Sequence, residues 1–213
     1  MLYKDPFIIK PETFTLIQEL QSLDFLKGFY LVGGTALALK LGHRNSIDID
    51  LFTQTEFDET ELIENLKDKF LLSVSFTKKN TLISTVNSIK TDFIRHNNPL
   101  INEPITEEGI TYLSMEDIAA MKLHAIENSG KRLKDFIYIY FLLEHFSLNQ
   151  MLVFYGIKYP YMNKLIALRA INFFEDIDPN IDPPILKKPL PFSKISKRIN
   201  EAILKGNKVF NAK

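Results

Sequence analysis

The stretch from Leu31 to Phe52, LVGGTALALKLGHRNSIDIDLF, restricts the possible folds of this chain more than any other part of the sequence. A short apolar strand pattern ends at two glycines, a helix pattern follows, and a second strand pattern carries Asp48 and Asp50. Because alternate residues of a strand point the same way, the two aspartates share one face. The opposite face then carries three apolar residues, Ile47, Ile49 and Leu51.

More strand patterns follow this stretch. The runs LLSVSFTKK and TLISTVN lie on either side of Asn80, a residue common in turns, and they predict a β-hairpin. A third run, SIKTDFIRH, carries Asp92 between apolar neighbours. This carboxylate either meets a cation or lies on a solvent-facing edge, because burial of an unpaired carboxylate is costly.

Helix patterns alone occupy the second half of the chain. Ser114 followed by Asp117 is typical of a helix start, and Thr13 is expected to cap an earlier helix. The predicted fold class is therefore α+β. We expect residues 1–113 to form a mixed sheet with flanking helices, and residues 114–213 to form a helical domain with a basic C-terminal tail.

The composition excludes several classes of protein. Apolar residues make up 46% of the chain, which is typical of a globular protein, and the absence of cysteine excludes disulfides and thiolate zinc sites. No apolar run approaches the roughly 18 residues of a membrane span, and the N-terminus lacks the apolar region of a signal peptide. We expect a cytoplasmic protein with no membrane partner.

Charge is unevenly distributed along a chain whose formal net charge is zero. The segment from Lys187 to Lys213 contains eight basic residues and one acidic residue, Glu201, whereas the remainder contains 18 basic and 25 acidic residues. Such a basic segment can bind a polyanion such as nucleic acid. It can equally be a solvated helix that neutralises the acidic remainder.

The paired aspartates indicate a divalent cation. Asp48 and Asp50 would repel each other unless a positive charge lay between them, and their hard oxygen ligands suit Mg²⁺. Because Mg²⁺ in such sites often also binds substrate phosphates, the pair predicts a phosphate-bearing substrate. Asp92 is the candidate for a third carboxylate, and three carboxylates on adjacent strands can hold two metal ions.

The glycines fit the same interpretation. A strand, a glycine pair and a helix start place backbone N–H groups where they can bind phosphate. Gly33 and Gly34 permit close approach, and Thr35 can add a hydroxyl donor. Thirteen residues separate Gly34 from Asp48, and the two motifs together are far more specific than either alone.

The segment Leu31–Phe52 resembles the first motif of the nucleotidyltransferase superfamily, and it is most similar to the AbiEii/AbiGii toxins of abortive-infection and type IV toxin–antitoxin systems. The segment MEDIAAMKLHAIENSGKRLKDFIYIYFLLE is similar to that family's helical motif, in which a lysine on one helix precedes a Lys-Asp pair on the next. The resemblance covers about residues 28 to 145.

The resemblance implies a polymerase-β-like catalytic core that uses Mg²⁺, or Mn²⁺, and an NTP. By this match Asp48, Asp50 and Asp92 would be catalytic metal ligands, and Gly33 and Gly34 would bind the triphosphate. Many relatives have serine at the second glycine position, and Thr35 is the expected substitute.

Further residues match the family's run R-x-S/T-x-D-x-D and its helical motif. Arg44 and Ser46 would bind phosphate or brace the turn. Lys122 would neutralise charge on the leaving pyrophosphate. Asp135 would orient Lys122 or Lys134, or act as a base. Relatives often carry a second Asp three residues after Asp135, where this sequence has a tyrosine.

The resemblance implies a toxin that transfers a nucleotidyl group from an NTP to an acceptor, with the 3′ end of tRNA as the expected acceptor. A cognate antitoxin should be encoded beside it. The alternatives are transfer to a protein hydroxyl or a small molecule, and a nucleotide-binding protein without catalytic activity. The motifs do not distinguish acceptors, because they concern only the NTP and the metal.

Overall fold

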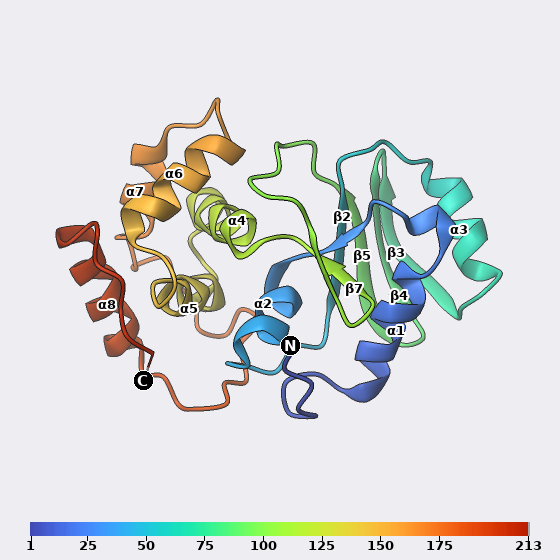
Figure 1. The fold of residues 1–213 in the computed structure, drawn as a ribbon, viewed down its shortest axis with the longest axis horizontal. Coiled ribbons are helices and arrows are strands. Elements are labelled where there is room, and N and C mark those ends of the chain that lie inside the picture. The colour runs from blue at the N-terminus through green and yellow to red at the C-terminus, as the bar shows by residue number, and fades with distance from the viewer. Residues whose placement is uncertain (213) are drawn as a thin grey trace. The chain divides into compact units, whose positions relative to one another are not determined.

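A computed structural model describes residues 1–212 (Figure 1). Within them the chain forms, in order, the elements α1 (Pro11–Gln21), η1 (Asp24–Leu26), β1 (Tyr30–Leu31), α2 (Gly33–Leu41), β2 (Ile49–Thr53), α3 (Glu59–Lys67), β3 (Leu72–Lys78), β4 (Thr81–Val86), β5 (Ile89–Arg95), β6 (Ile105–Glu107), β7 (Ile110–Tyr112), α4 (Met115–Asn128), α5 (Leu133–Leu142), α6 (Leu148–Lys158), α7 (Lys164–Ala170) and α8 (Phe192–Leu204).

The chain divides into two compact units. The sheet unit comprises Met1–Asn98 and Glu103–Leu113, and the helical unit comprises Pro99–Asn102 and the chain from Ser114 onward. Lys213, which the sequence analysis includes in the basic tail and the second domain, lies outside the described residues. Strands are followed by helices alone, so the predicted α+β class with a mixed sheet is confirmed.

The sheet has the strand order β3-β4-β5-β2-β1-β7-β6. Strands β2 and β5 are parallel, as are β1 and β7, whereas the other neighbouring pairs are antiparallel. The predicted hairpin is formed by β3 and β4, and Asn80 takes the positive φ of 60° that its turn requires. The parallel pairing of β2 with β5 places side by side two strands that lie far apart in the sequence.

The core of the sheet unit follows the alternation of β2. Ile49 and Leu51 are fully buried, whereas Asp50 between them is only partly buried. Two expectations were wrong in detail. Ile47 is 57% exposed, because β2 begins at Ile49 and the chain before it does not follow the strand alternation. Thr13 is a buried residue inside α1, which instead begins with a proline at its first position.

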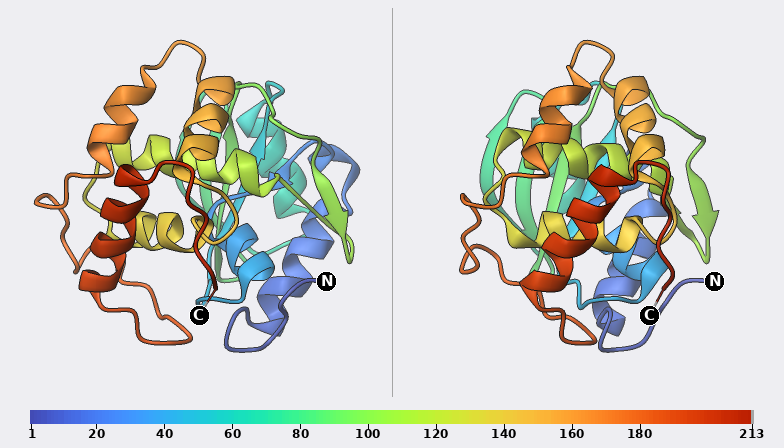
Figure 2. Two further views of the ribbon diagram at one scale, coloured as in Figure 1. Left: turned by 60° about the vertical axis from the view of Figure 1, so that its left-hand side comes forward. Right: turned by 90° about the vertical axis from the view of Figure 1, so that its left-hand side faces the viewer.

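The helical unit is organised around α4, which packs against α5, α6 and α7, while α8 packs against α5 (Figure 2). Ser114 caps α4 by accepting a hydrogen bond from the Asp117 amide, as predicted. The aromatic stripe of α5 is core, since Phe136, Tyr138 and Ile139 are at most 1% exposed. Among residues 1–212, none of the helices combines the length and the apolar character that crossing a bilayer requires.

A buried ion pair fixes the short segment Pro99–Asn102 to the helical unit. Lys158 Nζ lies 2.7 Å from an Asp117 carboxylate oxygen, and both side chains are fully buried. The Asp117 carboxylate also accepts hydrogen bonds from the amides of Ile101 and Asn102, and Lys158 donates to the Pro99 carbonyl. These bonds compensate the cost of burying both charges.

Candidate active site

The glycine pair begins α2 directly after β1, so both glycines lie in the first helical turn. Gly33 has a φ of +68°, and a Cβ atom built on it would lie 2.6 Å from Asp50 Oδ2. The amide of Val32 donates to the Asp50 carbonyl at 2.9 Å. A side chain at position 33 would therefore displace the Asp50 carboxylate, and glycine lets that carboxylate lie against the start of the helix.

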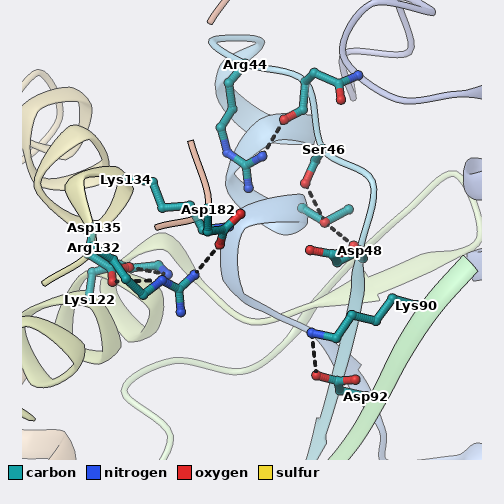
Figure 3. Close-up of polar contacts among 12 residues, drawn as sticks. Arg44, Ser46, Asp48, Lys90, Asp92, Lys122, Arg132, Lys134, Asp135 and Asp182 are labelled. Carbon is teal, nitrogen blue, oxygen red and sulfur yellow. Dashed lines mark hydrogen bonds and ion pairs between the residues drawn. The ribbon is translucent and has the colours of Figure 1, made fainter. Parts of the chain in front are cut away.

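The hydroxyls of Thr35 and Ser46 are engaged within the protein. They lie 2.7 Å apart, and Thr35 Oγ1 donates to the backbone carbonyl of Asp48 (Figure 3). Both residues are at most 2% exposed. Of the two roles considered for Ser46, this geometry favours bracing the approach to β2 over contact with phosphate. Thr35 has the same bracing contacts.

Arg44 and its neighbour His43 are also buried. The Arg44 guanidinium donates to the carbonyl of Asn45, so at least one of its N–H groups holds the local turn. Burial and the adjacent Arg44 charge lower the pKa of His43 to about 3. His43 is therefore neutral at physiological pH and cannot serve as a cationic phosphate ligand.

Asp50 and Asp92 are direct partners in the parallel register of β2 and β5. The Asp92 side chain is 11% exposed, and its Oδ2 lies 3.2 Å from Lys90 Nζ (Figure 3). Asp92 Oδ1 is buried, and within residues 1–212 no donor reaches it. An acceptor oxygen of this kind is costly unless a ligand completes its coordination.

The electrostatics tie Asp48 and Asp50 to the same cluster. Burial raises the pKa of Asp92, Lys90 opposes that rise, and the nearby Asp48 charge adds to it. For Lys90, burial lowers the pKa, but attraction to Asp92, Asp48 and Asp50 outweighs burial, so the net pKa is raised. Three carboxylates therefore share the field of one ammonium group, and these four groups carry a net charge of −2 when all of them are ionised.

The donor set fits a divalent metal ion. Carboxylate oxygens suit Mg²⁺ and Mn²⁺, and the buried Asp92 Oδ1 is an acceptor without a donor. Within residues 1–212 no three His, Asp or Glu side chains are already arranged as a metal-binding group. The structure thus brings Asp48, Asp50 and Asp92 into one electrostatic cluster around Lys90, without a preformed coordination shell.

In the helical unit, Lys122 and Asp135 form an ion pair. Lys122 Nζ lies 3.0 Å from Asp135 Oδ1, and their side chains are only 13% and 5% exposed. The ammonium also lies 4.3 Å from the centroid of the Tyr138 ring, within cation–π range. Tyr138 stands where relatives often have an aspartate, and here its ring holds the same lysine. Of the partners considered for Asp135, the structure therefore selects Lys122.

Lys134 forms an ion pair with Asp182. Arg132 Nη2 donates to Asp182 at 3.0 Å, and Arg132 Nε lies 3.7 Å from Asp135 Oδ2 (Figure 3). Asp182 belongs to the segment DIDPNIDPPILKKPLPF before α8, whose five prolines predict a linker or an extended strap. That segment has neither helix nor strand between Ala170 and Phe192 in the described chain, and its contacts with α5 favour the strap.

Sequence reasoning missed three contributors to these clusters. Lys90 lies two residues before Asp92, so the strand period alone would have placed both on one face. Tyr138 follows Asp135 by three residues, and the helical period gives the same signal. Asp182 carries no such signal, because its contact spans 50 residues from Arg132.

A cavity of about 560 Å³ lies in the helical unit between α5, α8 and the chain after α8. Its lining is rich in basic side chains, namely Lys188, Lys194, Lys197, Arg198 and Lys208. Arg198 is buried against Glu144, and Lys208 pairs with Glu201. Among the described residues the structure records no ion pair for Lys188, Lys194 or Lys197, which are all exposed. We refer to this cavity as the basic groove.

The model of the family described as nucleotidyl transferase AbiEii toxin, type IV TA system, matches residues 16–179. The chain belongs to this family. As a member of the AbiEii toxins it is a nucleotidyltransferase, which confirms the predicted family, and the family implies an NTP substrate and an antitoxin partner.

The chain is also similar to one sequence relative and to two solved structures over most of its length. An uncharacterized protein of Aquifex aeolicus is 32% identical over 174 residues, which span 79% of this chain and 84% of the relative. JHP933 of Helicobacter pylori superposes with a TM-score of 0.56 at 14% identity, covering 91% of this chain and 89% of that one. MenT4, a nucleotidyltransferase toxin of Mycobacterium tuberculosis, gives 0.55 at 15% identity, with coverages of 89% and 80%. The fold shared with these two structures therefore extends over most of the chain.

Proposed function

We propose that this AbiEii nucleotidyltransferase uses Mg²⁺, or Mn²⁺, to transfer a nucleotidyl group from an NTP to the 3′ end of tRNA, and that this reaction is its toxic activity. The observation that carries the proposal is the parallel pairing of Asp50 with Asp92 beside Gly33. It brings two carboxylates together next to the first turn of α2, whose amide groups can receive phosphate.

The metal ligands in this proposal are Asp48, Asp50 and Asp92. A bound divalent ion would supply positive charge to the phosphates and orient them for in-line displacement. Gly33 and Gly34 would bind the triphosphate through their backbone N–H groups at the start of α2. The bracing of the Asp48 carbonyl by Thr35 supports this arrangement, because it fixes the chain from which Asp48 projects.

The reaction forms one P–O bond and breaks another. The 3′ hydroxyl oxygen of the acceptor attacks the α-phosphorus of the NTP, and the bond from that phosphorus to the bridging oxygen of the β-phosphate breaks, so pyrophosphate leaves. The hydroxyl proton must pass to a base. Asp92 is the candidate for this role, because its Oδ1 is an acceptor that no donor reaches within residues 1–212.

Lys122 would stabilise the charge that develops on the leaving pyrophosphate. Asp135 would then be a positioning residue, since its carboxylate and the Tyr138 ring both hold the lysine ammonium. A lysine held by two buried partners loses little conformational entropy when it acts, which favours preorganised stabilisation.

The basic groove supports a polyanionic acceptor. Its three exposed lysines, Lys188, Lys194 and Lys197, are spaced along the helical unit and can contact successive phosphates. Contacts of this kind position nucleic acid without reading its sequence. They favour tRNA over a small-molecule acceptor, which would not need an extended basic surface.

The test is incubation of the purified protein with Mg²⁺, each labelled NTP in turn and total tRNA. We expect label on tRNA with wild type and none with Asp48→Asn. In the same experiment, Lys194→Met with Lys197→Met should raise the KM for tRNA and leave the KM for NTP unchanged. Label that appears on protein or on a small metabolite, and not on RNA, would replace tRNA by that acceptor.

The toxin role has its own test. We propose that the antitoxin is encoded beside this chain, with a small DNA-binding protein directly upstream as the supporting arrangement. Expression of the chain alone should arrest growth, and co-expression of the neighbouring gene should restore it. Growth arrest by Asp48→Asn equal to that of wild type would separate toxicity from nucleotidyl transfer.

A further inference from the structure

Lys90 lies inside the acidic cluster and has no part in the proposed chemistry. It follows Ile89 at the start of β5, two residues before Asp92, so both side chains leave the same face of the strand. Its ammonium contacts Asp92 at 3.2 Å and is attracted by Asp48 and Asp50. Lys90 therefore contributes a positive charge to this group of three carboxylates.

The two partners of this ion pair differ in exposure. The Lys90 side chain is 53% exposed, whereas the Asp92 side chain is 11% exposed and is fixed within the sheet. A long, half-exposed lysine can turn into solvent without disturbing the core, because no apolar packing depends on its tip. The carboxylates cannot separate in the same way, since Asp50 lies against Gly33 and is paired in register with Asp92.

We infer that Lys90 is a built-in counter-cation that occupies the acidic cluster until a divalent metal ion displaces it. This inference rests on the proposed metal dependence and adds a regulatory element to the same site. Metal binding must break the contact between Lys90 and Asp92, so Lys90 lowers the metal affinity of the free protein. The triphosphate of an NTP offers the displaced ammonium a new anionic partner.

The consequence is coupling between metal and nucleotide. Without NTP, the metal competes with Lys90 for the same oxygens. With NTP, the lysine gains a phosphate contact when it leaves, so displacement costs less and the metal binds more tightly. The free protein would then hold little metal, and the active site would be completed when both ligands arrive.

The test measures binding of Mn²⁺ to the protein by electron paramagnetic resonance, in the absence of NTP. We expect Lys90→Met to bind Mn²⁺ about three- to fivefold more tightly than wild type, the change that corresponds to the loss of one partly exposed ion pair. Lys90→Arg keeps the charge and should bind as wild type does. Lys79→Met removes one exposed positive charge from the β3–β4 turn of the same unit and is the matched control.

Three outcomes decide the matter. Tighter Mn²⁺ binding by Lys90→Met alone supports the inference. Equal binding by wild type, Lys90→Met and Lys79→Met, with Asp48→Asn abolishing it, overturns the role of Lys90 and leaves the metal site intact. If neither wild type nor any Lys90 variant shows Mn²⁺ binding that is lost with Asp48→Asn, both this inference and the metal dependence of the proposed function are overturned.

Folding of the variants is checked by thermal unfolding with and without Mn²⁺. In the absence of metal, Lys90→Met should unfold at a slightly lower temperature than wild type, because the Asp92 carboxylate then loses its ion pair with Lys90. Added Mn²⁺ should raise the unfolding temperature of Lys90→Met by more than it raises that of wild type. Equal increases in the two proteins contradict the displacement of Lys90.

Discussion

The sheet unit and the helical unit each bring a lysine to aspartates, but the two lysines are held in different ways. Lys90 is 53% exposed and faces three carboxylates, of which only Asp92 is within ion-pair distance. Lys122 is 13% exposed and is held between the Asp135 carboxylate and the Tyr138 ring. In the sheet unit, acidic side chains outnumber a half-exposed lysine that can move into solvent. In the helical unit, a buried lysine is held in place by two partners.

The most severe way to test this contrast is to remove a cation from a fixed, buried pair. Lys158→Met leaves the fully buried Asp117 carboxylate without its counter-charge, and we expect it to lower the free energy of unfolding by about 3–5 kcal/mol. Urea unfolding measures the loss. Lys90→Met is the comparison variant, and it should change the free energy of unfolding by no more than about 1 kcal/mol. Equal losses in the two variants would remove the distinction.

The second test concerns activity. Asp50→Asn removes a carboxylate from the acidic cluster, and nucleotidyl transfer should fall more than about a hundredfold, which is roughly 2.7 kcal/mol of barrier. Its free energy of unfolding should stay close to that of wild type. Asp182→Asn, which removes a partly exposed partner in the helical unit, should change the rate less than about threefold. A large loss of the nucleotidyl-transfer rate in Asp182→Asn would indicate that the proline-rich segment takes a direct part in the reaction.

The third test sharpens the account of the fixed cation. Tyr138→Leu removes the ring that lies 4.3 Å from Lys122 Nζ, and kcat for nucleotidyl transfer should fall about three- to fivefold. Tyr138→Phe keeps the ring face and should retain the kcat of wild type. If both variants lose activity equally, the tyrosine hydroxyl, and not the ring, is the group that matters.

The smallest expected effect is a dependence of stability on pH. Burial raises the pKa of Asp92 above its ordinary value, so the folded protein binds this proton more tightly than the unfolded chain does. The resulting stability is present below the unfolded pKa and is lost as the pH rises through the folded pKa. Asparagine does not titrate, so the stability of Asp92→Asn does not fall with pH in this way. In urea unfolding without divalent metal, the stability of Asp92→Asn relative to wild type should increase as the pH rises above about 4, the ordinary pKa of an aspartate. A constant difference would contradict the burial effect.

Local patterns predicted much of the fold and part of the site. The alternation in β2, the turn at Asn80 and the cap at Ser114 depend on neighbouring residues, and the structure has all three. The carboxylates of Asp50 and Asp92 were expected on adjacent strands, and β2 and β5 are adjacent. Such features can be predicted from the sequence, because the periods of strands and helices determine which residues share a face.

The remaining features depend on packing that the sequence does not encode locally. Thr35 was expected to be available to phosphate, and Ser46 either to bind phosphate or to brace the turn. Their hydroxyls bond each other, because α2 buries the face that carries Thr35. The pairing of Lys134 with Asp182 requires the proline-rich segment to return to α5. Neither arrangement follows from residue spacing, since each depends on which tertiary partner is present.

The attachment of Pro99–Asn102 to the helical unit means that neither unit is a continuous piece of the chain. A fragment that starts at Ser114 would lack the Ile101 and Asn102 amides, and its Asp117 carboxylate would lose two donors in an apolar interior. Recombination at that boundary would therefore yield a weakened helical module. When the sheet unit and the helical unit are exchanged between relatives, the chimaera should fold well only if Pro99–Asn102 is taken from the same protein as the helices.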